Sequence, residues 1–244
     1  MASRDQACSA CASTLDCFGD HAEVCPAKGD LTLRHNGVQR ILWEECKRAG
    51  LEAELEKGGL LPDKPAEERP DGAEEAQQDS RESQEGGDGR RRPADIWLPK
   101  GAKGRGDCKA VAHDVGFSSG LQHEVARWSA TDPDYAVRGY RARKEAFKET
   151  LKKCLDQGFD FSPLIFESHG GGFGPEVRAL ISKVADLQEA KGVFCKEGHS
   201  LRIAQRVSTA LHKASARAIL RRTAVDCGWD EAPASELVGS WELQ

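Results

Sequence analysis

The sequence predicts a mixed α/β domain in which one small sheet packs against helices, and three observations lead to that class. The expected elements follow the order helix, strand, strand, strand, helix, strand, helix. Two strand-sized apolar runs, Ala94–Leu98 and Ala110–Phe117, flank a loop rich in glycine and lysine, which is typical of an antiparallel hairpin. Each run contains one aspartate, Asp95 or Asp114. Because a buried carboxylate must be paired or bound to a metal, two on adjacent strands suit one shared divalent cation.

Composition limits the classes of protein that fit. The chain has 244 residues, 39% of them hydrophobic and 31% charged, so we expect one domain with small appendages. No run is apolar enough to cross a membrane, and no apolar segment follows Met1 as in a signal peptide. We therefore expect an intracellular, nuclear protein with no membrane partner. Nine cysteines in a reducing compartment favour metal ligation over disulfides.

The cysteines cluster once, within the first 29 residues. Cys8, Cys11, His21 and Cys25 follow the pattern C-x2-C-x9-H-x3-C, which suits tetrahedral zinc. This short segment has little apolar material, so a bound metal would have to supply most of its folding free energy. Cys17 is an alternative ligand to Cys11, and a disordered tail with incidental thiols is the alternative to a zinc site.

The main domain begins with a helix expected from about Leu31 to Ala49, with Asp30 as its N-cap. Arg34 and His35 lie in its first turns, where they either contact nucleic-acid phosphates or belong to a solvated face. The alternating run Leu51–Leu55 then predicts the first strand of the sheet.

An acidic insertion, about residues 63–91, separates the first two strands. Asp63–Asp88 carries 10 acidic and 3 basic side chains, so the rest of a chain with net charge −5 is mildly basic. The segment has few apolar residues, and we expect it to be disordered. It is either solvated filler or an acidic segment that regulates the domain or mimics DNA.

A second helix is expected over Asp134–Gln157. One apolar face repeats along it at helical spacing, formed by Val137, Tyr140, Lys144, Phe147, Leu151 and Cys154. Lys144 is the charged member of this face, and it either extends its aliphatic stem to solvent or faces the two aspartates. Phe159–Glu167 predicts the fourth strand, and Pro175–Ala190 a helix after a glycine-rich turn. That turn either holds phosphate or is only a tight turn.

The last expected helix, about Ser200–Thr223, gathers basic side chains on one face: Arg202, Arg206, Lys213, Arg217 and Arg221. We predict that this face contacts the phosphates of DNA, or of RNA, with solvated charge as the alternative. The predicted organisation is a zinc knuckle at 1–29, a main domain at 30–192, and a basic helix with a tail at 193–244.

The element order and particular motifs together point to a family. The order αβββαβ, with Asp95 and Asp114 on the second and third strands, resembles the core of the PD-(D/E)xK nucleases. The matching motifs are Leu15-Asp16-x-x-Gly19-Asp20-His21-Ala22-x-x-Cys25, Arg34-His35-Asn36, Glu54-Leu55-Glu56, Arg92-Pro93-Ala94-Asp95, Asp114-Val115 and Ser118-Ser119. Between Cys8 and Ala190 the chain resembles the restriction-like endonuclease of site-specific retrotransposons that lack long terminal repeats, and related reverse-transcriptase-like proteins.

The resemblance implies DNA cleavage. Asp95 and Asp114 would hold Mg²⁺ or Mn²⁺, which polarises the scissile phosphate, and a lysine would stabilise the developing charge. The zinc knuckle and nearby basic groups would position the nucleic acid. A reverse transcriptase would act as a partner in trans, because these 244 residues contain no polymerase.

The sequence departs from the general superfamily pattern at one catalytic position. Gly116 stands two residues after Asp114, where the lysine of the D-x-K motif is expected. In the retrotransposon branch that lysine has moved to the following helix, which matches Lys144; Lys148 is a weaker substitute. Two other functions stay open, a zinc-bearing nucleic-acid-binding module that does not cleave, and a decayed remnant of an element.

Overall fold

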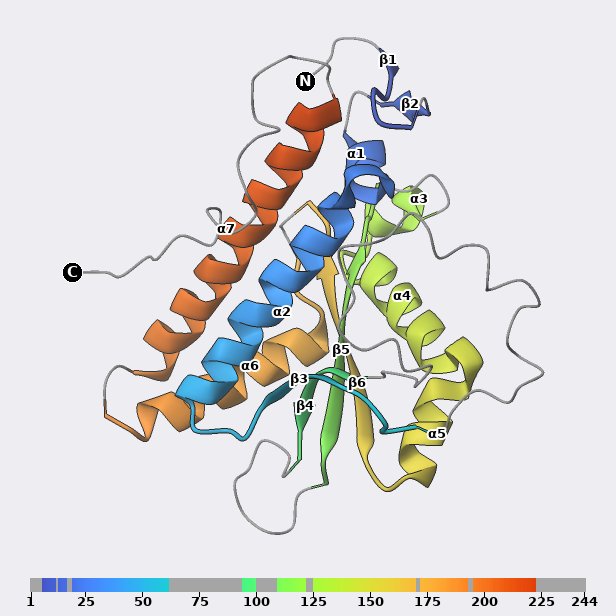
Figure 1. Cartoon of the computed structure of the whole chain (residues 1–244). Coiled ribbons are helices and arrows are strands. Elements are labelled where there is room, and N and C mark those ends of the chain that lie inside the picture. The colour runs from blue at the N-terminus through green and yellow to red at the C-terminus, as the bar shows by residue number, and fades with distance from the viewer. Residues whose placement is uncertain are drawn as a thin grey trace.

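The computed structural model describes residues 6–11, 13–16, 19–61, 94–99, 109–121, 125–169, 172–192 and 195–222. A four-stranded mixed sheet with helices on both faces forms the body of the protein (Figure 1). Its strands are β3 (Glu54–Lys57), β4 (Ala94–Leu98), β5 (Val111–Ser118) and β6 (Asp160–Glu167). Its helices are α2 (Asp30–Arg48), α3 (Ala126–Ser129), α4 (Tyr135–Ala146), α5 (Thr150–Asp156), α6 (Pro175–Glu189) and α7 (Lys196–Arg222). The mixed α/β class predicted from the sequence is confirmed.

The sheet has the order β3-β4-β5-β6. The predicted hairpin is confirmed, because β4 pairs antiparallel with β5 and Ile96 lies opposite His113. β6 runs parallel to β5 and places Pro163 opposite Asp114. Proline lacks a backbone N–H, and β6 tolerates Pro163 because it forms one edge of the described sheet.

The two faces of the sheet bury different groups of side chains. Alternation along β5 sends Val115 to one face and Asp114 and Gly116 to the other. Helices α2, α6 and α7 cover the first face with the main apolar core, which includes Val38, Leu42, Val177, Ile181, Ile203, Val207 and Leu211. Helices α4 and α5 cover the second. Asp114 and Gly116 therefore face α4 and α5.

The single helix expected over Asp134–Gln157 is wrong. Helix α4 ends at Ala146, a 3-10 turn η5 (Phe147–Glu149) follows, and α5 begins at Thr150. Lys148 and Glu149 adopt left-handed φ values of 50° and 58°, which interrupt the helical hydrogen bonds. The break turns Phe147 outward, so this residue is 65% exposed rather than part of the buried face.

Two expectations about helix ends are also corrected. Asp30 is the first residue of α2 rather than its cap, and no side-chain cap bond forms there. Its carboxylate is buried and accepts a hydrogen bond of 2.7 Å from Arg222 Nη1 at the end of α7. α7 also starts earlier than expected, at Lys196.

Some predictions fall outside the described residues. These concern the acidic insertion at about 63–91, Cys17, two glycines of the glycine-rich turn, and the chain after Arg222. Within the described ranges, no helix has the length and apolar character needed to cross a bilayer.

Candidate functional site

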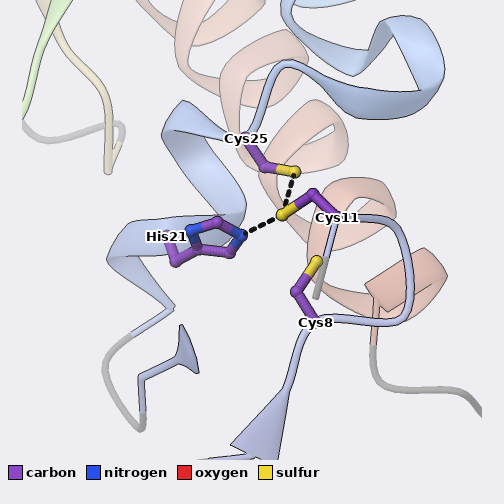
Figure 2. Close-up of side chains that lie close together, drawn as sticks. All are labelled: Cys8, Cys11, His21 and Cys25. Atoms are coloured by element: carbon purple, nitrogen blue, oxygen red, sulfur yellow. Dashed lines mark hydrogen bonds between the residues drawn. The ribbon is translucent and has the colours of Figure 1, made fainter. Parts of the chain in front are cut away.

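The four predicted zinc ligands meet at one point (Figure 2). The ligand atoms of Cys8, Cys11, His21 and Cys25 all lie within 4.8 Å of one another. Cys11 Sγ is 3.2 Å from His21 Nε2 and 3.6 Å from Cys25 Sγ. Tetrahedral zinc with Zn–S bonds of about 2.3 Å would separate neighbouring sulfurs by about 3.8 Å, so the group has the size and the donor set for zinc.

Local backbone structure brings the zinc ligands together. β1 (Gln6–Ala7) and β2 (Thr14–Leu15) form a small hairpin that carries Cys8 and Cys11, and α1 (Asp20–Val24) carries His21. The Asp16 carboxylate accepts hydrogen bonds from the Asp20 and His21 backbone N–H groups, at 3.1 and 2.7 Å. It therefore caps α1 and fixes the helical turn that presents the imidazole.

The thiols of this group are not equivalent. Burial raises the pKa of Cys8, whereas hydrogen bonds from the Ser13 side chain and backbone lower the pKa of the exposed Cys11 to about 6. Zinc binds thiolates, so Cys11 is the ligand most ready to bind near neutral pH.

The segment that carries the four candidate ligands contacts the main domain through Arg222 and Ser9. Arg222 is fully buried and its guanidinium donates to the carbonyls of Cys25 and Ala27, at 3.3 and 2.9 Å, as well as to Asp30. The Ser9 hydroxyl donates to the Arg222 carbonyl at 3.2 Å and so provides a hydrogen-bond partner for a backbone carbonyl at the end of α7. The metal site is therefore attached to the last turn of α7.

A second contact joins the knuckle to the start of α2. Arg34 is buried, forms an ion pair with Glu23 and stacks over the Phe117 ring at 4.6 Å. The expectation that Arg34 meets nucleic-acid phosphates is wrong, because its guanidinium is enclosed and already paired. On the neighbouring strand end, Ser119 donates a hydrogen bond to Asp20.

The acidic site lies where β4 and β5 run side by side. Asp95 on β4 and Asp114 on β5 are neighbours, and each carboxyl group affects the pKa of the other. The backbone N–H of Val115 donates to Asp95 Oδ2 at 2.6 Å, and His35 Nε2 from α2 lies 2.9 Å from the same oxygen. Carboxylate oxygens are the hard donors that Mg²⁺ and Mn²⁺ prefer, and binding of such an ion by this pair stays a prediction.

Lys144 reaches this site from α4. Its Nζ lies 2.8 Å from both Asp114 oxygens and donates to the Val115 carbonyl at 3.3 Å. Of the two alternatives left by the sequence, the side chain faces the aspartates rather than solvent. Lys148, the weaker substitute, lies beyond the end of α4 in the 3-10 turn.

Because residue 116 is glycine, the Lys144 side chain has room to reach Asp114. A Cβ at position 116 would come within 2.7 Å of Tyr140, 3.0 Å of Ile165 and 3.1 Å of Lys144 Cε. A longer residue there, such as the lysine of a D-x-K motif, would collide with the side chains that α4 lays over the strand. Lys144 on α4 therefore fits against the sheet because position 116 on β5 has no side chain.

The two carboxyl groups differ in their acidity. Burial opposes ionisation of Asp95, yet the hydrogen bond and charge of His35 lower its pKa below the ordinary value. Burial raises the pKa of Asp114 to about 6, with Lys144 opposing the rise and Asp95 adding to it. The hydrogen bond to Asp95 in turn raises the pKa of His35. At neutral pH the site therefore holds the Asp95 and Asp114 carboxylates next to the Lys144 ammonium group.

The predicted basic stripe on α7 is occupied by acidic partners from α2. Arg202 donates to both Glu45 oxygens, at 2.9 and 2.6 Å, and Arg206 pairs with Glu44 and Glu45. Arg217 and Arg221 lie beside Asp30. The expectation of an open basic face is therefore wrong for these arginines, whose charge is used inside the fold.

The two other residues predicted to contact nucleic acid are His35 and Lys213. His35 stands in the acidic site, and its contact with phosphate stays a prediction. Lys213 is exposed on α7, and for it too contact with nucleic acid stays a prediction. No local signal predicts that Glu45 and Arg222 are buried, because an acidic and a basic residue far apart in the chain look like ordinary surface charges.

Comparisons of the chain with protein-family models, with curated proteins and with solved structures find no match.

Proposed function

We propose that the chain is a metal-dependent DNA endonuclease with a PD-(D/E)xK-like core and a structural zinc site, related to the restriction-like endonucleases of retrotransposons. The observation that carries the proposal is the meeting of Asp95, Asp114 and Lys144, with Gly116 leaving space for the lysine stem. Two carboxylates and one ammonium from different elements converge, although each is costly to bury alone.

The proposed mechanism assigns a role to each side chain. Asp95 and Asp114 would hold Mg²⁺ or Mn²⁺, which when bound supplies Lewis-acid activation of the phosphate and lowers the pKa of its water. Lys144 would turn from Asp114 towards the phosphate and stabilise the charge that develops there. His35 and the Val115 N–H keep Asp95 ionised and oriented.

A zinc-bearing nucleic-acid-binding module without cleavage is the second candidate. The ion pair between Lys144 and Asp114 favours it, because this pair satisfies the acidic site without any divalent cation. A decayed remnant of a mobile element is a separate alternative, which would fold poorly and show no saturable zinc binding.

Nicking of supercoiled plasmid separates the two candidates. The zinc-loaded protein should convert supercoiled DNA to open circles in Mg²⁺ or Mn²⁺, and Asp114→Asn and Lys144→Met should each abolish this activity. Lys152→Met is the matched control, because Lys152 is a solvent-exposed lysine on α5 and should not affect nicking. DNA binding without nicking in any divalent metal would favour the binding module.

A further inference from the structure

Large aromatic rings are exposed on α3 and α4. Trp128 is 51% exposed, Tyr135 37% and Phe147 65%. Trp128 and Tyr135 stack on each other with ring centres 6.0 Å apart. Single exposed apolar side chains are ordinary, but three rings along one helix and its approach indicate a contact surface.

Arginines lie over aromatic rings on the same surface. The Arg127 guanidinium is 5.5 Å from the Trp128 ring centre, and that of Arg143 is 4.9 Å from the Tyr140 ring centre. In the described part of the chain, no carboxylate forms an ion pair with Arg127 or Arg143, in contrast to the arginines of α7. These two cations are therefore available to an anionic partner.

Between Tyr135 and Phe147, the exposed face of α4 carries a strip of small residues. Gly139, Ala142 and Ala146 are all exposed and lie within a narrow arc at 100° per residue. A Cβ at Gly139 would meet nothing within 4 Å. A chain-like ligand can therefore approach the α4 backbone closely along this strip.

Tyr140 links these arginines and rings to the acidic site. The Arg143 guanidinium lies 4.9 Å from the centre of the Tyr140 ring, and Lys144 Nζ lies 5.8 Å from the same centre. Lys144 in turn binds Asp114. A ligand that follows α4 past Tyr140 thus reaches the carboxylates.

We propose that the aromatic-basic surface, formed by Arg127, Trp128, Tyr135, Gly139, Arg143 and Phe147, binds an unpaired DNA strand and leads it to Asp95 and Asp114. Bases in a duplex keep their faces covered, whereas unpaired bases stack on exposed rings. The phosphates of the same strand supply the anions for Arg127 and Arg143. The inference rests on the proposed endonuclease function and narrows its substrate to DNA with a single-stranded segment.

Fluorescence anisotropy tests the inference without cleavage, using zinc-loaded protein with no added Mg²⁺ or Mn²⁺. The probes are a fluorescein-labelled single-stranded DNA and the duplex of the same sequence. Trp128→Ala should weaken single-strand binding at least about fivefold and duplex binding less than about twofold, because one stacked base accounts for a factor of this order. Leu201→Ala is the control, since Leu201 is 60% exposed on α7 and should leave both affinities unchanged.

A second pair of variants tests the strip itself. Gly139→Glu places a negative charge in open space and should weaken single-strand binding, whereas Gly139→Gln has the same size without the charge and should not. Circular dichroism checks that each variant is folded. Unchanged single-strand binding in both Trp128→Ala and Gly139→Glu would overturn the inference, as would equal losses for single strand and duplex in Trp128→Ala.

The same samples distinguish the inference from the proposed function. If Trp128→Ala loses single-strand binding but the wild-type protein never cuts DNA in Mg²⁺ or Mn²⁺, the endonuclease proposal fails and the binding surface stands. If wild type cuts DNA and both surface variants cut single-stranded substrate equally well, the surface is wrong and the endonuclease stands.

Discussion

Substitution of Glu45 tests how α7 is held on the domain. Glu45 is 1% exposed on α2 and accepts hydrogen bonds from Arg202, Arg206 and Gln188. Burial alone would raise its pKa, but the bonds and charges of these partners lower it to about 2 from an ordinary 4.5. Glu45→Gln keeps the shape of the side chain and removes the charge.

The size of the effect follows from that pKa difference. A depressed pKa in the folded state stabilises the protein above the unfolded-state pKa, and this stabilisation is lost as the pH falls towards the folded-state value. The contribution of Glu45 is about 3 kcal/mol at pH 7 and falls to about 1 kcal/mol at pH 3. Glu45→Gln should therefore lower the unfolding free energy by about 3 kcal/mol at pH 7 and converge with wild type in acid.

Urea unfolding followed by far-ultraviolet circular dichroism, at several pH values between 3 and 7, measures this difference. Any metal bound by Cys8, Cys11, His21 and Cys25 would be released by acid in both proteins, so the comparison between them is preserved. Glu44→Gln is the matched control, because the neighbouring Glu44 is 28% exposed at its side chain and should cost less than about 1 kcal/mol. A Glu45→Gln protein as stable as wild type at pH 7, or a difference that does not change with pH, would refute the reasoning.

Three other predictions follow from the sites. Cys11→Ser should abolish the tetrahedral thiolate absorption of the Co²⁺-loaded protein. Removal of metal should increase hydrogen exchange at the end of α7, which Ser9 and Cys25 contact. Unchanged exchange would show that metal binding does not support this contact. Gly116→Ala should displace Lys144 and Tyr140, because its Cβ would lie 2.7 Å from Tyr140. We expect nicking to fall by at least about tenfold and the free energy of unfolding in urea to fall by about 1–3 kcal/mol. Full nicking activity would show that Lys144 does not need the space at position 116. Arg222→Met should reduce stability by about 1–3 kcal/mol, because the buried Cys25 and Ala27 carbonyls and Asp30 would each lose a donor while Arg221 still pairs with Asp30. Arg40→Met, on an exposed i,i+4 pair, should cost less than about 1 kcal/mol.

Local features of the structure were predictable from the sequence. The four candidate zinc ligands lie on a short hairpin and the helix that follows it, so their spacing along the chain largely determines the distances between them. The strands β4, β5 and β6 and the helix α6 were predicted within one or two residues, because alternation, a proline at N1 and flanking turns are local signals. The broken helix was missed, since the left-handed residues Lys148 and Glu149 are neither glycine nor asparagine.

The candidate zinc ligands, the fold class and one aspartate on each of two neighbouring strands could all be predicted from the amino-acid sequence. Packing between distant segments was needed to show that Asp95 lies beside Asp114, that Lys144 passes over Gly116 to reach Asp114, and that Arg202 and Arg206 bind Glu45. The reason is physical: a charged residue looks the same in the sequence whether water or a buried partner surrounds it, and the partner is chosen by packing between segments far apart in the chain.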